Sequence, residues 1–265
     1  NIPTSTAQCI DKVKRHYSEI LGDNLRGLYI HGSIAMKCFN PTSSDIDVLV
    51  VVQDALDLDM KKRLGDVHLG LACDNPLELS VVLQRYLDNF VHPTPFEFHY
   101  GDDFKEAFET GTVDLITPRS DPDLAAHFII VKHYGVTVVG EPAQSVFPDV
   151  PRKAYLDSIA QDARWSYNNV MGGPDEGECA VPRYAVLNSC RILAYLDDTQ
   201  NVMSKRGGGE WGLEHLPQKY APVIQEALNE YAVAGSSQPI DAALLKSFVH
   251  YAYERIRPHL QDDAS

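Results

Sequence analysis

The chain has 265 residues, with 37 acidic and 23 basic side chains and a formal net charge of -14. This excess of acid argues against a nucleic-acid partner, because surfaces that follow phosphates need Lys and Arg. No apolar run approaches the roughly 20 residues of a membrane span, and the N-terminus lacks the layout of a signal peptide. We therefore expect a cytoplasmic protein without a membrane partner, and a monomer.

Cysteine and histidine usage gives no sign of a metal or disulfide framework. The five cysteines are widely scattered and form no CxxC pair; they are Cys9, Cys38, Cys73, Cys179 and Cys190. An odd number without paired spacing predicts buried or incidental thiols, with neither disulfides nor a zinc site. The ten histidines show no metal-ligand spacing, and we interpret them as structural.

The first half of the chain alternates helical and strand patterns. Apolar spacing predicts a helix over 5–21, strands over 25–31 and 45–52, a helix over 57–71 and a strand over 77–83. The four valines of 45–52 are typical of a central, buried strand. Residues 92–100 are extended and marked by proline, a helix follows from 121 to 134, and 136–139 predict an edge strand. This alternation indicates an α/β domain with a mixed sheet flanked by helices.

The second half is predicted to be almost entirely helical. Prolines at 142, 148 and 151 indicate a boundary, which divides the chain into domains 1–152 and 153–265. Helical patterns cover 153–169, 182–197, 218–234 and 240–257, typical of an all-α bundle. Two segments, 171–181 and the glycine-rich 204–210, are predicted to be irregular loops.

The stretch from 29 to 52 carries the most specific chemistry. A strand runs into Gly32 and Ser33, and after ten residues Ser44 and Asp45 open the valine-rich strand that contains Asp47. Residues i and i+2 of a strand face the same side, so Asp45 and Asp47 should project together. Two adjacent carboxylates repel unless a hard cation such as Mg²⁺ joins them and holds phosphate oxygens against them.

Two further features complete this hypothesis. The turn at Gly32 and Ser33 offers backbone amides and a hydroxyl to phosphate oxygens, and glycine permits close approach. Glu78 is the candidate third carboxylate, because an acid at the start of an apolar strand is costly unless it is paired or metal-bound. The alternatives are a solvated turn for the aspartate pair and a surface glutamate at a strand end for Glu78.

Together these motifs resemble the nucleotidyltransferase superfamily that includes DNA polymerase beta, whose signature is a glycine-serine turn followed by an acid-x-acid strand. Along nearly the whole chain, the sequence resembles the streptomycin/spectinomycin adenylyltransferases, which join this domain to a helical one. Besides the two motifs, the resemblance covers residues 76–82, 121–125, 139–142, 187–193, 210–217 and 248–251.

The resemblance implies roles for individual residues. Asp45, Asp47 and Glu78 would bind two Mg²⁺ ions, with Glu78 also the base that activates the acceptor hydroxyl. ATP would be the co-substrate, with Ser33 and Ser44 at its phosphates, and with further nucleotide contacts from Asp123, Lys205 and Tyr231. Each of these last three has an alternative: an acid that complements a helix N-terminus, a solvated loop lysine, and a core tyrosine.

The sequence also departs from the family pattern. The family usually carries glycine a few residues after the serine, where this chain has Lys37, Cys38 and Phe39. A tryptophan that stacks on the drug is missing, and Phe104 is the candidate substitute. Candidate acceptor contacts in the second half are the loop acids Asp175, Glu176 and Glu178, which solvation alone could explain, and Trp165, which we expect more readily in the core.

The sequence therefore predicts transfer of AMP from ATP to a hydroxyl of a small cationic antibiotic of the aminoglycoside type, with release of pyrophosphate. Such a reaction would inactivate the drug and give resistance. One alternative keeps the transfer and changes the acceptor to another small molecule or a protein side chain. A second alternative is a nucleotide-binding regulator without turnover.

Overall fold

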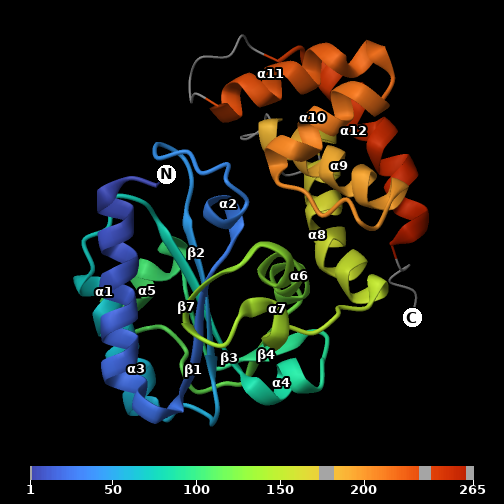
Figure 1. Ribbon diagram of the computed structural model, residues 1–265. Helices are drawn as coiled ribbons and strands as arrows, with labels where there is room; N and C mark the ends of the chain where they lie inside the picture. The colour runs from blue at the N-terminus through green and yellow to red at the C-terminus, as the bar shows by residue number, and fades with distance from the viewer. Residues whose placement is uncertain (1, 173–181, 233–239, 261–265) are drawn as a thin grey trace. The chain divides into compact units, whose positions relative to one another are not determined.

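A mixed five-stranded sheet forms the centre of the N-terminal half of the chain in the computed structural model (Figure 1). The structure describes residues 2–172, 182–232 and 240–260, and the chain divides into two units, Asn1–Pro151 and Arg152–Ser265. The strand order is β5-β3-β2-β1-β7. The strands are β1 (Leu25–Ile30), β2 (Ile46–Val52), β3 (Leu77–Leu83), β5 (Phe98–Tyr100) and β7 (Val136–Gly140).

One pair of strands in this sheet is parallel, and it carries the candidate acids Asp47 and Glu78. β2 runs parallel to β3, whereas β1 pairs antiparallel with β2 and β7, and β5 pairs antiparallel with β3. A separate two-stranded sheet joins β4 (Thr94–Phe96) to β6 (Arg119–Asp121). The parallel pair brings the starts of β2 and β3 to the same end of the sheet.

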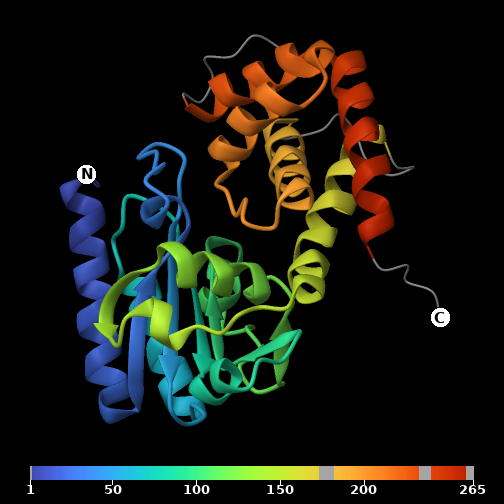
Figure 2. The ribbon, with the colours of Figure 1, turned by 45° about the vertical axis from the view of Figure 1, so that its right-hand side comes forward.

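Helices cover both faces of the sheet, which explains the nearly continuous apolar runs of β2 and β3. One layer contains α1 (Thr4–Leu21), α3 (Leu58–Gly70) and α5 (Lys105–Glu109); the other contains α4 (Gln84–Asp88), α6 (Leu124–Tyr134) and α7 (Ala143–Val146). Figure 2 shows the same two layers from another side. Val48 and Val50 pack toward the α1 layer, and Leu49 and Val51 pack toward the α6 layer.

The second unit is helical. Its elements are α8 (Arg152–Met171), α9 (Pro182–Asp197), α10 (Lys205–His215), α11 (Ala221–Ala232) and α12 (Ala242–Ile256). The central helix is α9, which contacts each of the other four. Its buried residues join Phe248 of α12 and Ile224 of α11 in one apolar cluster. The observed mixed sheet with flanking helices and the helical second half confirm the predicted fold class at this level.

The glycine-rich segment 204–210 is not the irregular loop that the sequence predicted. Ser204 caps α10 by accepting a hydrogen bond from the Gly207 amide at 3.0 Å, and Lys205 begins the helix. Gly208 faces α9 so closely that a Cβ atom there would lie 2.8 Å from the Arg191 Cα. The absence of a side chain at Gly208 thus allows α9 and α10 to pack closely. This tertiary contact outweighs the low helix propensity of glycine.

The structure also corrects the prediction that no disulfide is present. Cys9 of α1 and Cys73, in the segment before β3, form a disulfide with Cα atoms 5.5 Å apart. The two residues are 64 positions apart in sequence, so no local spacing could reveal the pairing. Cys190 agrees with the prediction of a buried thiol, and burial raises its pKa to about 12. Cys179 lies outside the described residues.

Among the described residues, no helix combines the length and the apolar character needed to cross a bilayer.

The close crossing of α9 and α10 gives a first prediction. Gly208→Ala should lower the free energy of unfolding by about 1–3 kcal/mol, because the new methyl group overlaps the α9 backbone. Gly207→Ala is the matched control: its Cβ would meet Ser204 Oγ at 3.4 Å, an ordinary contact, and alanine should raise stability by up to about 1 kcal/mol. Chemical denaturation measures both. Equal stabilities for the two variants would contradict the crossing.

Candidate active site

The turn after β1 opens the short helix α2 (Gly32–Ala35), and its first residue is a glycine whose conformation and surroundings disfavour any side chain. Gly32 has φ +55, in the left-handed region. A Cβ atom there would overlap a carboxylate oxygen of Asp47. The His31 amide donates to the Asp47 carbonyl at 3.0 Å, which ties the turn to the start of β2. The Asp47 carboxylate therefore lies directly against the turn.

Ser33 presents a hydroxyl with unused hydrogen-bonding capacity. Its Oγ is buried and has no hydrogen-bond partner in the described part of the chain. Buried hydroxyls nearly always have partners, so an unsatisfied one needs a specific explanation. A ligand oxygen received by the turn at Gly32 and Ser33, beside the Asp47 carboxylate, supplies that explanation.

Asp47 and Glu78 lie side by side. They are partners in the parallel register of β2 and β3. Their neighbours Val48 and Leu79 point into the α1 layer, so both acids project from the opposite face, where each is half-buried. Asp45 is exposed and stands one residue before β2. The adjacent-strand placement expected for Glu78 is the one observed, whereas the binding roles of the three acids stay predictions.

The chemistry of these acids fits magnesium when phosphate is present. Within 2–172, 182–232 and 240–260, no group of three or more His, Cys, Asp and Glu side chains is arranged to hold a metal. Mg²⁺ rarely needs such a cage, because it is usually bound by one or two carboxylates together with water and substrate phosphates. Asp47 and Glu78 are two such carboxylates, and Ser33 is positioned for the phosphate side.

His99 is a neighbour of these acids that the sequence analysis did not single out. On β5 it lies opposite Ser80, whose Oγ is 2.9 Å from His99 Nδ1. Burial lowers the pKa of His99, the carboxylates of Glu78 and Asp121 oppose that shift, and the charges of His127 and Arg119 add to it. A lowered pKa keeps the imidazole neutral near pH 7. Glu78 and Ser80 are polar residues on the same face of β3, and this alternation was the sequence signal that could have indicated a polar partner such as His99 on the next strand.

Aromatic side chains border His99 at the β5 edge of the sheet. The Phe104 ring centroid is 5.3 Å from that of His99, in an edge-to-face arrangement, and Phe96 is 5.9 Å away. The Arg119 guanidinium lies 5.7 Å from the Phe96 centroid and 6.0 Å from the Phe104 centroid. Phe104 therefore borders His99 while it packs against the apolar cluster of the α1 layer, and its role in acceptor binding stays a prediction.

Two nucleotide-site candidates of the first unit have local structural partners. The Ser44 hydroxyl accepts a hydrogen bond from the Asn40 amide at 3.0 Å and thereby closes the turn before Asp45. Asp123 immediately precedes α6, and its side chain makes no capping hydrogen bond to that helix. Its amide donates to Asp121 Oδ1 at 2.8 Å. Asp123 thus occupies the position that the helix-dipole alternative expects.

The candidates of the second unit lie on helices. Lys205 is in the first turn of α10, with Nζ 4.1 Å from the Tyr184 ring centroid; its predicted loop position is wrong. Tyr231 of α11 is partly buried against the apolar cluster of this unit. Trp165 of α8 is 45% exposed, which contradicts our expectation of a core residue. Asp175, Glu176 and Glu178 lie outside the described residues.

The departure at Lys37 has a structural counterpart. Among the described residues other than glycine, Lys37 is the one with positive φ, at 59. A lysine in this left-handed conformation carries a strain of about 1–2 kcal/mol, which glycine would avoid. This position is therefore one where the glycine expected from the family pattern would fit without strain.

The fold is that of a solved adenylyltransferase. The chain superposes with a TM-score of 0.74 on spectinomycin adenyltransferase AAD(9) from Enterococcus faecalis, whose crystal structure contains ATP and spectinomycin. The match covers 95% of this chain and 99% of that one at 23% sequence identity. At that identity the likeness establishes the fold alone.

Sequence comparisons find similar proteins over most of the chain. Residues 145–255 match the family described as aminoglycoside adenylyltransferase, C-terminal domain. A spectinomycin 9-adenylyltransferase from Staphylococcus aureus is 26% identical over 241 residues, covering 87% of this chain and 85% of that protein. An aminoglycoside (3'') (9) adenylyltransferase from Klebsiella pneumoniae is 25% identical over 263 residues, covering 94% and 93%. The chain is therefore similar to aminoglycoside adenylyltransferases over most of its length.

The unsatisfied hydroxyl of Ser33 leads to a second prediction. Ser33→Ala should leave the melting temperature of the ligand-free protein unchanged or slightly higher, because no protein partner is lost. It should weaken binding of ATP with Mg²⁺ about fivefold, the value of one hydrogen bond of about 1 kcal/mol. Thermal melts and calorimetric titration measure the two effects.

The control for Ser33→Ala is Ser43→Ala, at an exposed position of the neighbouring loop, which should change neither quantity. A clear loss of stability in ligand-free Ser33→Ala would mean that the hydroxyl already has a partner inside the protein. Unchanged ATP binding would remove Ser33 from the phosphate site.

Proposed function

We propose that this chain transfers AMP from ATP to a hydroxyl group of an aminoglycoside-type antibiotic, such as spectinomycin or streptomycin, and so inactivates the drug. The observation that carries the proposal is the pairing of Asp47 with Glu78 beside the turn of Gly32 and the unsatisfied Ser33. Its relatives, named for adenylylation of spectinomycin and other aminoglycosides, support it. So does the Enterococcus structure that contains ATP and spectinomycin.

In this proposal the first unit binds the triphosphate. Gly32 leaves room for phosphate oxygens at the turn, and Ser33 donates its hydroxyl proton to one of them. Ser44 and Asp123 are the further candidate contacts to the nucleotide, and Lys205 and Tyr231 are those of the second unit. The candidate acceptor contacts are Phe104, Trp165 and the acids Asp175, Glu176 and Glu178.

Asp45, Asp47 and Glu78 would hold Mg²⁺, two ions in the full complement, together with the phosphates. Bound Mg²⁺ would supply neutralisation of the charge on the phosphate oxygens. Without that neutralisation, Asp47 and Glu78 would repel a triphosphate placed against the turn. The acids would therefore favour binding of the Mg²⁺ complex of ATP over binding of free ATP.

Glu78 would act on the acceptor. The hydroxyl oxygen attacks the α-phosphorus in line, a new oxygen–phosphorus bond forms, and the bond to the bridging oxygen of pyrophosphate breaks. The hydroxyl proton passes to the Glu78 carboxylate. Because Glu78 lies directly opposite Asp47, the base and the phosphate turn are held on the same face of one rigid sheet, which fixes their spacing for the reaction.

Two other functions keep part of this chemistry. A different small-molecule or protein acceptor would use the same acids, and the missing stacking tryptophan is the observation that favours it. A regulator that binds nucleotide without turnover would need neither Glu78 nor an acceptor. Pyrophosphate release with ATP, Mg²⁺ and a panel of antibiotics separates the three functions, and the mass of the product identifies the acceptor.

A third prediction tests the base. Glu78→Gln should bind ATP but lose turnover by about 10²–10⁴-fold, the usual contribution of a general base. Turnover is measured as antibiotic with one added AMP by mass spectrometry, and ATP binding by calorimetry. Glu106→Gln, an exposed glutamate of α5, is the control and should match the wild type. Normal turnover in Glu78→Gln would eliminate Glu78 as the base.

A further inference from the structure

Asn75 is a buried polar residue that the reaction itself does not use. Its side chain is 6% exposed, and it lies in the segment 71–76 that joins α3 to β3. Two residues later β3 begins, with Glu78 at its second position. A buried amide so close to a proposed catalytic residue calls for a description of its partners.

The side-chain oxygen and nitrogen of Asn75 both form hydrogen bonds with other segments of the chain. Thr6 of α1 donates its hydroxyl to Asn75 Oδ1 at 3.2 Å. Asn75 Nδ2 donates to the Pro41 carbonyl at 2.9 Å and to the Ser44 carbonyl at 3.0 Å. The amide thus joins α1, the segment before β3 and the loop that ends at Asp45.

The loop before Asp45 is held by hydrogen bonds rather than by packing. Residues 41–43 are exposed, so they contribute no buried apolar surface. Within the loop, the Ser44 amide donates to the Asn40 carbonyl at 2.8 Å. The bonds from Asn75 reach both ends of this turn, and the Ile46 amide donates to the Pro76 carbonyl at 2.8 Å. The placement of Asp45 relative to β3 therefore depends on these bonds.

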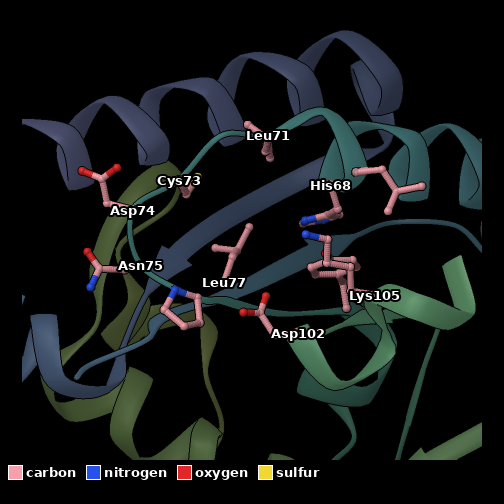
Figure 3. Close-up of a pocket in the computed structure, with 11 residues that line it drawn as sticks. His68, Leu71, Cys73, Asp74, Asn75, Leu77, Asp102 and Lys105 are labelled. Carbon is pink, nitrogen blue, oxygen red and sulfur yellow. The ribbon is translucent and has the colours of Figure 1, made fainter. Parts of the chain in front are cut away.

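Packing of the 71–76 segment is incomplete on its other side, although Leu71 and Cys73 touch the apolar core. A cavity of about 210 Å³ borders it, lined also by His68, Leu77, Asp102 and Lys105 (Figure 3). Figure 3 shows Cys73 and Asn75 on the segment that passes below a neighbouring helix. Three links to α1 hold the segment there: the Cys9–Cys73 disulfide, the Thr6–Asn75 hydrogen bond and a hydrogen bond from Lys12 Nζ to the Ala72 carbonyl at 3.5 Å.

We propose that Asn75 is a positioning residue: through Pro41 and Ser44 it sets Asp45 against Asp47 and Glu78, and so determines the affinity for ATP with Mg²⁺. This inference rests on the proposed function. Thr6 anchors the amide oxygen, which leaves both N–H groups directed at the Asp45 loop. The disulfide secures the segment but does not orient the amide.

Asn75→Asp is the direct test, because it keeps the shape and the acceptor for Thr6 but places an oxygen against two carbonyl oxygens. Binding of ATP in excess Mg²⁺ should weaken about tenfold by calorimetry, since a buried pair of acceptors is left unsatisfied. The KM for ATP should rise by a similar factor, with kcat at saturation within about threefold of wild type. A merely structural role would lower the melting temperature and leave KM unchanged.

The matched control removes the disulfide instead. The double variant Cys9→Ser, Cys73→Ser loosens the same segment while the amide bonds remain, so its melting temperature should fall and its ATP affinity should stay within about twofold of wild type. If Asn75→Asp does not fold, Thr6→Val provides the measurement. It removes only the anchor of the amide oxygen and should weaken ATP binding about threefold.

Wild-type affinity in a folded Asn75→Asp or Thr6→Val variant would overturn the inference, as would an equal loss of affinity in the disulfide variant. Failure of the wild-type protein itself to bind ATP with Mg²⁺ would overturn the proposed function, and this inference with it. The two failures are therefore distinguishable.

Discussion

The parallel pairing of β2 with β3 is the constraint on which the site depends. It places Asp47 opposite Glu78, and because helices cover both faces of these strands, a slip of either strand by one residue would turn its acid into the apolar α1 layer. Two carboxylates held this close favour a divalent cation. In the proposed function, the rigidity that holds the two carboxylates together also favours the joint binding of nucleotide and cation.

The surrounding segments adapt to this pair. The Asp47 carboxylate occupies the space that a side chain at Gly32 would need. The Ser33 hydroxyl has no hydrogen-bond partner in the described part of the chain, and Asn75 connects the Asp45 loop to the segment before β3. Gly32, Ser33 and Asn75 bury little apolar surface. The first unit therefore places its stability in the two apolar layers and its chemistry in a small number of hydrogen bonds at one end of the sheet.

Sequence patterns predicted the parts of the fold that follow from local periodicity. The strand over 77–83 and the leading helix agree closely with β3 and α1, since their apolar spacing is a local property. The disulfide and the place of His99 depend on contacts between distant segments. The glycine-rich start of α10 was misjudged because its glycines match a neighbouring helix rather than a turn.

Gly32 and Lys37 both have a left-handed backbone conformation, but they limit sequence change to different degrees. At Gly32 a side chain would overlap the Asp47 carboxylate, so a mutation there would force that carboxylate to move as well as strain the backbone. Lys37 has a comparable φ but only a modest energetic cost. The chain shares about a quarter of its residues with its relatives. At that divergence, the strain of a lysine at position 37 can be compensated elsewhere, whereas a side chain at position 32 would also displace the Asp47 carboxylate.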